Sequence, residues 1–83
     1  MKDKVKVLHN QLINTKYHTP YRTIQEHVIT IADLKVTGED NFRGDCVETN
    51  FNPELLRPYL SAMNITIKIR QIDIQTFRIW RMI

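Results

Sequence analysis

The last twenty residues, 64–83, alternate apolar and polar side chains over long parts of their length and are rich in isoleucine, threonine and aromatic residues. β-Branched and aromatic residues in period-two alternation are typical of strands. No glycine or proline interrupts the run, and it holds the single tryptophan, Trp80. The pattern therefore predicts that the C-terminal quarter of the chain forms β-structure.

The simplest arrangement of this stretch is a hairpin that turns at residues 75–76. One long strand and a terminal amphipathic helix are the alternatives. In a hairpin, residues directly opposite each other share a face, so one register fixes both faces. This register gives an apolar face and a polar face with these pairs: Ile74 with Phe77, Ile72 with Ile79, Asp73 with Arg78, and Gln71 with Trp80.

The N-terminal segment favours a helix over residues 3–14. Val5, Leu8 and Leu12 recur at helical spacing, and Asp3 is a suitable N-cap. The alternative is a short strand, because residues 4–8 also alternate, and lysines near a helix start oppose its dipole.

Residues 27–36 have the composition of a strand, and those of even number are mostly apolar. Residues 37–45 contain both glycines and several turn-forming side chains, which predicts a loop. Residues 46–51 then resemble a second strand, expected to lie antiparallel to the first.

A second helix is expected to begin at residues 52–54, where Asn52 is a capping residue and Pro53 occupies the first helical position. Pro58 either bends this helix or starts it after a turn, since an internal proline removes a hydrogen bond. Asn64 is a suitable left-handed terminator. The expected apolar stripe consists of Leu56, Tyr59, Leu60 and Met63.

Together these elements predict one small α+β domain spanning residues 1–83, in the order α-β-β-α-β-β, with an antiparallel sheet covered by one or two helices. Apolar residues make up 42% of the chain and charged residues 25%, as in folded globular proteins. No apolar run approaches the roughly 18 residues of a membrane span, and no signal peptide is evident. A single cysteine agrees with a reducing, cytoplasmic location.

The charges divide the chain into basic, acidic and basic thirds. Residues 1–25 carry five basic and one acidic side chain, residues 26–54 two basic and seven acidic, and residues 55–83 five basic and one acidic. Such segregation serves either to solvate separate surfaces or to present complementary patches to a macromolecular partner.

Catalytic and metal-binding patterns are weak. The three histidines and Cys46 lack the closely spaced ligand pairs of a structural zinc site. His27 and Cys46 would face each other across the predicted first hairpin, but no third group completes a nucleophilic site. The acidic side chains around residues 33–48 lack the repeating ligand loop of a calcium site. We therefore expect no enzyme activity, no cofactor and no metal.

The strongest candidates for binding residues are one tyrosine of the second helix and the basic and aromatic side chains of the C-terminal strands. In the predicted register Arg70 and Arg81 are cross-strand neighbours, while Trp80 lies on the other face, which separates stacking from phosphate contacts. The candidates are Tyr59, Lys68, Arg70, Arg78, Trp80 and Arg81.

The expected function is binding of another protein without catalysis. Abundant isoleucine, asparagine and lysine indicate an AT-rich gene, as phage and mobile elements often have, so an accessory protein that inhibits a host factor or defence complex is the expected role. The alternative is an RNA- or DNA-binding module that uses the basic C-terminal strands, although no established RNA-binding motif is present. The sequence leaves the oligomeric state open.

Overall fold

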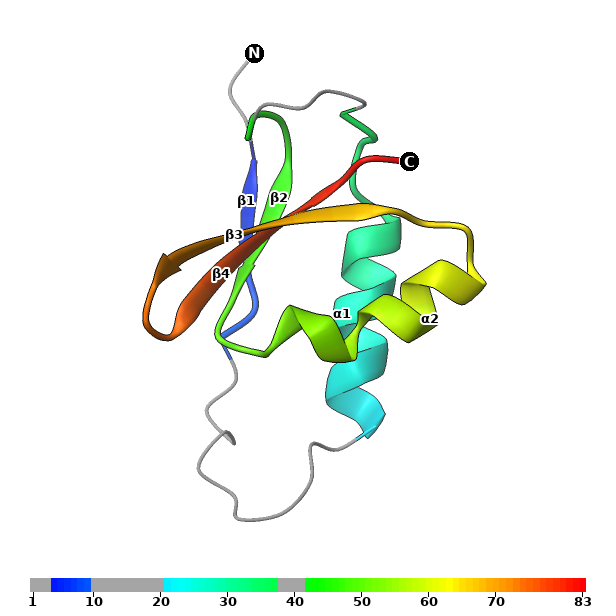
Figure 1. Ribbon diagram of the computed structural model, residues 1–83, viewed down its shortest axis with the longest axis horizontal. Coiled ribbons are helices and arrows are strands. Elements are labelled where there is room, and N and C mark those ends of the chain that lie inside the picture. Colours follow the sequence, from blue (N-terminus) through cyan, green and yellow to red (C-terminus); the bar gives the residue numbers. More distant parts are fainter. Residues whose placement is uncertain (1–3, 10–20, 38–41) are drawn as a thin grey trace.

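Strands and helices alternate along most of the chain, and the computed structural model describes residues 4–9, 21–37 and 42–83 (Figure 1). The elements are β1 (Val5–Val7), α1 (Tyr21–Ala32), β2 (Cys46–Thr49), the 3₁₀ helix η2 (Pro53–Leu55), α2 (Arg57–Ala62), β3 (Ile67–Asp73) and β4 (Thr76–Arg81).

The four strands form one sheet in the order β1-β2-β4-β3. β1 runs parallel to β2, while β4 runs antiparallel to both β2 and β3. Figure 1 shows α1 and α2 on the same side of this sheet. The predicted α+β class with a mostly antiparallel sheet and two helices is confirmed, whereas the described elements follow the order β-α-β-α-β-β.

The first predicted helix is wrong where the structure describes it, because residues 5–7 form the edge strand β1. Its backbone pairs with β2, and the amide of Leu8 donates to the carbonyl of Glu48 at 2.8 Å. The alternation of residues 4–8 was therefore the better signal. Residues 10–14 of the predicted helix lie outside the described residues, as do residues 38–41 of the predicted loop.

The strand predicted at residues 27–36 is also wrong, because helix α1 contains residues 21–32. Its buried side chains, Thr23, His27 and Ile31, recur every four residues and face the sheet. Burial of one helical face outweighs the β-propensity of the run Val28–Ile31, since propensity is a weak local preference. The strand predicted at residues 46–51 is confirmed over residues 46–49, but it pairs with β1 and β4 instead of with residues 27–36.

The start of the second helical region follows the sequence closely. The side chain of Asn52 accepts a hydrogen bond from the amide of Glu54 at 3.1 Å, with Pro53 in the first position. A 3₁₀ turn comes first, and α2 then begins at Arg57 with Pro58 in its first turn, where a missing N–H group costs little. Asn64 has a φ of 60°, the left-handed conformation expected of a helix terminator.

The hairpin of β3 and β4 exists, but its predicted register is wrong. Ile79 pairs with Ile69 instead of Ile72, and the turn lies at residues 74–75. The carboxylate of Asp73 accepts a hydrogen bond from the amide of Gln75 at 2.8 Å, and this local bond favours the observed turn. The remaining predicted pairs are replaced by Lys68 with Trp80, Arg70 with Arg78, Gln71 with Phe77, and Asp73 with Thr76.

The core lies between the sheet and the two helices. Ile79 is fully buried there as predicted, but Ile72 and Ile74 are 44% and 87% exposed, and Phe77 is half-buried. The shift in register turned the even-numbered residues of β3 away from the helices. The buried cluster comprises Ile31, Leu34, Val47, Phe51, Leu56, Leu60, Ile65, Ile67 and Ile79.

Candidate functional site

An apolar groove lies between the outer sides of α1 and α2. It has a volume of about 530 Å³, and none of the described residues that line it is charged. The half-buried side chains of Ile24 and Val28 contribute to the lining from α1. We call this feature the helix groove, and its exposed large apolar side chains are Tyr21, Ile29, Tyr59 and Met63.

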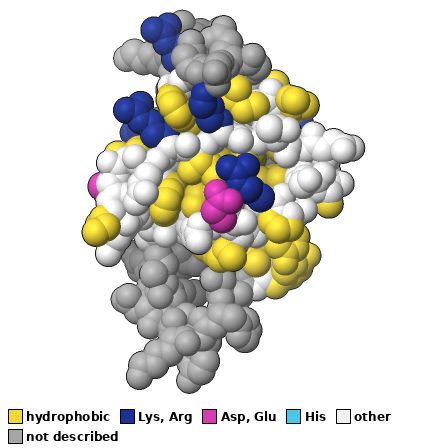
Figure 2. Space-filling view, viewed as in Figure 1, with side chains coloured by type: hydrophobic (Ala, Val, Ile, Leu, Met, Phe, Trp, Pro, Cys, Tyr) yellow, Lys and Arg dark blue, Asp and Glu magenta, His cyan; other side chains and the backbone are white. Residues whose placement is uncertain are grey.

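These four side chains leave much of their surface in solvent. Tyr21 is 60% exposed, Ile29 67%, Tyr59 41% and Met63 50%. In Figure 2 hydrophobic side chains gather at the lower right, where Figure 1 places the two helices. Contiguous exposed apolar surface of this kind marks interaction sites on small proteins.

The two tyrosines link the helices across the helix groove. The ring centroids of Tyr21 and Tyr59 lie 6.4 Å apart with an interplanar angle of 57°, a tilted aromatic contact. Tyrosine offers a large apolar face together with a hydroxyl group, and this combination is enriched at interfaces. Of the binding residues predicted from the sequence, Tyr59 is the one that the structure places in the helix groove.

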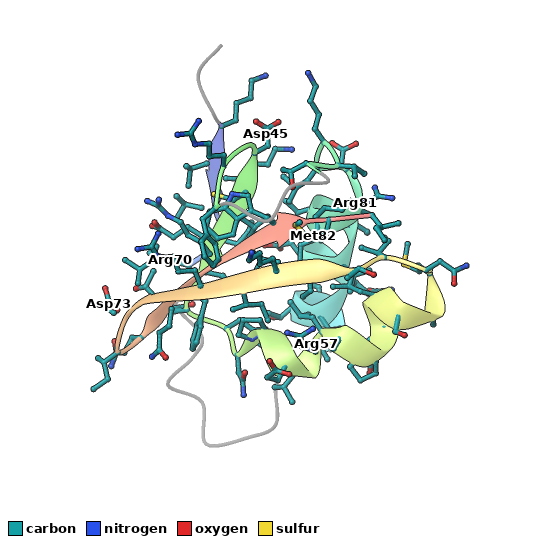
Figure 3. All side chains as sticks on the ribbon, turned by 45° about the horizontal axis from the view of Figure 1, so that its top comes forward. Asp45, Arg57, Arg70, Asp73, Arg81 and Met82 are labelled. Atoms are coloured by element: carbon teal, nitrogen blue, oxygen red, sulfur yellow. The ribbon has the colours of Figure 1, made fainter. Side chains whose placement is uncertain are left out.

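The four predicted basic and aromatic residues Lys68, Arg70, Arg78 and Trp80 lie on the opposite face of the sheet. Lys68 pairs with Trp80 and Arg70 pairs with Arg78, so all four side chains project to one side. The expected separation of Trp80 from Lys68 and Arg70 is therefore wrong. Figure 3 shows Arg70 above β3, on the side away from Arg57 and α2.

Phe42 covers this face from the loop that precedes β2. Its ring meets the indole of Trp80 edge to face, with centroids 5.1 Å apart. Lys68 Nζ lies 4.7 Å and Arg70 Cζ 5.2 Å from the centroid of the Phe42 ring, within range of cation–π attraction. We call Phe42, Lys68, Arg70, Arg78 and Trp80 the basic-aromatic face.

Arg78 is already engaged in an ion pair. Its Nε donates to Glu48 Oε1 at 3.2 Å, and the other carboxylate oxygen of Glu48 lies 3.7 Å from His9 Nε2. Trp80 is only 4% exposed, which removes it as an exposed anchor for a protein partner. The basic-aromatic face thus presents Arg70 and the ring of Phe42, 39% exposed, more openly than the indole.

Arg81 lies far from Arg70, near the end of α1 (Figure 3). It pairs with Ile67 across the hairpin, so the predicted Arg70–Arg81 proximity is wrong. Its guanidinium donates to the carbonyl of Ala32, the last residue of α1, and to the carbonyl of Ile83 at 2.9 Å. A cation at a helix C-terminus satisfies free carbonyls and complements the helix dipole, which gives Arg81 a structural role.

His27 forms a buried polar network with β2. Its Nδ1 lies 2.8 Å from the carbonyl oxygen of Thr23 and its Nε2 lies 2.7 Å from Thr49 Oγ1. A carbonyl only accepts, so Nδ1 carries the proton and Nε2 of the neutral ring accepts from the Thr49 hydroxyl. Burial lowers the pKa of His27, against smaller raising effects of the Thr23 carbonyl and of Glu26.

The predicted proximity of His27 and Cys46 is wrong. His27 contacts Thr49, and successive side chains of β2 point to opposite faces, so the buried thiol of Cys46, three residues from Thr49, lies on the other side of the sheet. Within the described ranges, no three His, Cys, Asp or Glu side chains group around a possible metal position. Glu39 and Asp40 of the acidic loop, and His18, lie outside the described residues.

The described acidic side chains are dispersed. The carboxylate of Asp45 accepts from the backbone amide of Lys4 at 3.1 Å. Asp33 lies 3.6 Å from Lys6 Nζ, on the helix side of the molecule, while Glu48 pairs with Arg78 on the other face. These three carboxylates therefore form separate contacts instead of one cluster.

Sequence reasoning missed Tyr21, Ile29 and Phe42. The two α1 residues escape the sequence analysis because it predicts a strand over residues 27–36 and no helix over residues 21–32, although Thr23, His27 and Ile31 recur every four residues. Phe42 falls within residues 37–45, for which the sequence predicts only a loop. A lone aromatic residue between turn-forming side chains was the available signal for a covering role.

No helix in the described part of the chain is long and apolar enough to cross a membrane. Comparison with protein-family models, with curated proteins and with solved structures finds no match.

Proposed function

We propose that this chain is a non-enzymatic protein-binding module that seats an apolar helical segment of another protein in the helix groove. The observation that carries the proposal is the exposure of Tyr21, Ile29, Tyr59 and Met63 around one uncharged groove. A protein that kept these side chains in water throughout its life would forgo the free energy of burying them.

The shape of the surface favours a helix as the occupant. A groove between two packed helices takes a ridge of apolar side chains spaced three and four residues apart, as amphipathic helices present. The lining offers few polar partners besides the amide of Gln25 and the tyrosine hydroxyls. An extended peptide, whose backbone amides need hydrogen-bond partners, would be poorly satisfied there.

The free energy available from burying the exposed side chains of the helix groove is large enough to contribute to binding a partner. Burying a large apolar side chain completely yields about 1.5–3 kcal/mol, so four partly exposed side chains supply several kcal/mol of favourable burial. Tyrosines such as Tyr21 and Tyr59 also lose little conformational entropy on binding, since each has only two side-chain torsions. We assign the binding to a reducing, cytoplasmic setting, where the buried Cys46 remains a thiol.

The test compares two isoleucine variants. Ile29 is 67% exposed in the helix groove and Ile74 is 87% exposed at the hairpin turn, so Ile29→Gln and Ile74→Gln remove similar apolar surface at little cost to folding. Tagged wild-type protein and both variants are used to capture proteins from cells that express the chain naturally. We expect a protein that wild type and Ile74→Gln retain and Ile29→Gln loses.

Two outcomes contradict the proposal. One is capture that is equal for the Ile29→Gln and Ile74→Gln variants, or absent for wild type. The other is a wild-type dimer in sedimentation analysis that Ile29→Gln dissociates, because the groove would then hold a second copy of this chain.

A further inference from the structure

The basic-aromatic face is hollowed by a pocket that is separate from the helix groove. The pocket has a volume of about 290 Å³ and is lined by Phe42, Arg70, Gln71, Ile72, Arg78 and Trp80. It lies across the sheet from α1 and α2, so a ligand there does not compete with one in the helix groove. We propose that it binds a nucleotide unit of a single-stranded nucleic acid, with the phosphate at Arg70 and Arg78 and the base against Phe42.

The phosphate position follows from the pairing of β3 with β4. Arg70 lies directly opposite Arg78, and like charges at directly opposed positions repel each other. The Nε of Arg78 lies 3.2 Å from Glu48 Oε1, so Arg78 has an acidic partner. Arg70, across the strand pair from Arg78, is exposed. An anion between the two guanidinium groups relieves this repulsion, and planar guanidinium groups match phosphate oxygens well.

The base position follows from Phe42. Its ring is 39% exposed, lines the pocket and meets the indole of Trp80 edge to face. Lys68 and Arg70 lie near the ring as cation–π partners, and a phosphate would draw these cations toward itself. The ring face then becomes available for a base, and stacking on aromatic side chains beside cations is the general mode of single-strand binding.

Trp80 supplies an additional observation. Its Nε1 is buried and has no hydrogen-bond acceptor among the described residues, although the indole lines the pocket. Buried N–H groups are nearly always paired, and an orphaned one costs stability. An oxygen atom of a ligand in this pocket would be the missing acceptor.

The test measures binding of fluorescent oligonucleotides by anisotropy at several salt concentrations. The probes are an eight-residue oligo-U, an eight-residue oligo-dT, uridine monophosphate as an unlabelled competitor, and a duplex of the same length. We expect single-strand binding that weakens as salt rises, with a log–log slope of about −0.7 per phosphate contact, because each phosphate contact releases counterions. We expect uridine monophosphate to compete with the labelled strands, because the proposed pocket holds one nucleotide unit.

Variants separate stacking from general charge attraction. Arg70→Gln should weaken binding at least fivefold and flatten the salt dependence, whereas Arg22→Gln, an equal charge change on exposed α1 surface, should change affinity less than twofold. Phe42→Leu should weaken single-strand binding at least threefold with an unchanged salt slope. Circular dichroism of each variant checks that the fold is retained.

Three results overturn the inference: no saturable single-strand binding at 50 mM salt, equal losses for Arg70→Gln and Arg22→Gln, or tighter binding of duplex that Phe42→Leu leaves unchanged. The Ile29→Gln variant should bind the oligonucleotides like wild type. A failure to bind nucleotides would therefore not contradict the protein-binding proposal, and a failure to bind a protein partner would not contradict nucleotide binding.

Discussion

His27 of α1 and Thr49 of β2 are joined by a buried hydrogen bond of 2.7 Å between Nε2 and Oγ1. Thr49 also accepts from the amide of Phe51 at 3.0 Å, and its oxygen lies 3.2 Å from the carbonyl of Leu8. A single hydroxyl hydrogen cannot serve both His27 and Leu8, and the shorter distance assigns it to the neutral imidazole. This network fixes the helix that forms one wall of the helix groove to the centre of the sheet.

The network predicts a pH-dependent stability. Burial lowers the pKa of His27 below its ordinary value of 6.5, so the unfolded chain takes up a proton at a higher pH than the folded protein does. The stabilisation is complete above about pH 6.5 and is lost as the pH falls toward the folded-state pKa, with a slope of at most about 1.4 kcal/mol per pH unit. The urea concentration at the midpoint of unfolding should therefore decrease as the pH is lowered from 7.5 to 5.5.

The His27→Gln variant separates this effect from other titrations. Its stability at neutral pH reflects the changed packing, but its dependence on pH between 7.5 and 5.5 should be flatter than that of wild type. Parallel pH profiles for the two proteins would show that His27 is not the group responsible.

The hairpin register predicts unequal effects for two isoleucines. Ile79 is fully buried in the core and Ile74 is 87% exposed at the turn. Ile79→Ala should therefore lower the free energy of unfolding by about 2–5 kcal/mol, and Ile74→Ala by less than about 0.5 kcal/mol. Chemical denaturation measures both losses. A loss above about 2 kcal/mol for Ile74→Ala would contradict the observed register and support the one in which Ile74 packs against Phe77.

Gly44 predicts a stability loss from a single methyl group. Its φ is 92°, and a Cβ added there would lie 2.5 Å from Thr37 Cγ2. Gly44→Ala should cost more than about 1 kcal/mol, because alanine is strained at positive φ and the methyl groups overlap.

The double variant Gly44→Ala, Thr37→Ser distinguishes the two causes. Serine keeps the hydroxyl that donates to the sulfur of Met82 but removes Cγ2. Thermal unfolding should show partial recovery, with the remainder due to backbone strain. A fully stable Gly44→Ala single variant would contradict this geometry.

Local sequence signals predicted part of the fold correctly. Asn52 and Pro53 start the second helical region, Asn64 ends it in a left-handed conformation, and residues 46–49 form a strand. Each of these features depends on side chains and backbone within a few residues. The α+β class followed from the same local information.

Long-range features were predicted less well. Helix α1 depends on burying Thr23, His27 and Ile31 against the sheet, a tertiary effect that overrides the β-propensity of its isoleucines and valine. The hairpin register depends on the turn, and the bond from the Gln75 amide to Asp73 places the turn one residue earlier than predicted.

The candidate site shows the consequence of these two errors. The helix groove requires α1, so Tyr21 and Ile29 stayed unrecognised while Tyr59, on the correctly predicted helix, was identified. The basic-aromatic face requires the observed register, since an odd shift moves every side chain of β3 to the other face of the sheet. Residue types suggested the binding chemistry, but strand pairing decided which residues act together.

The helix groove is the surface proposed to hold a protein partner, and methyl NMR of the complex locates the bound surface residue by residue. Partner recovered by the capture experiment is added to protein labelled at isoleucine and methionine methyl groups. We expect the signals of Ile29 and Met63 to shift or broaden on binding, while those of Ile72 and Ile74 keep their positions. Perturbation of Ile72 and Ile74 with unchanged Ile29 and Met63 signals would place the partner on the opposite face and contradict the account.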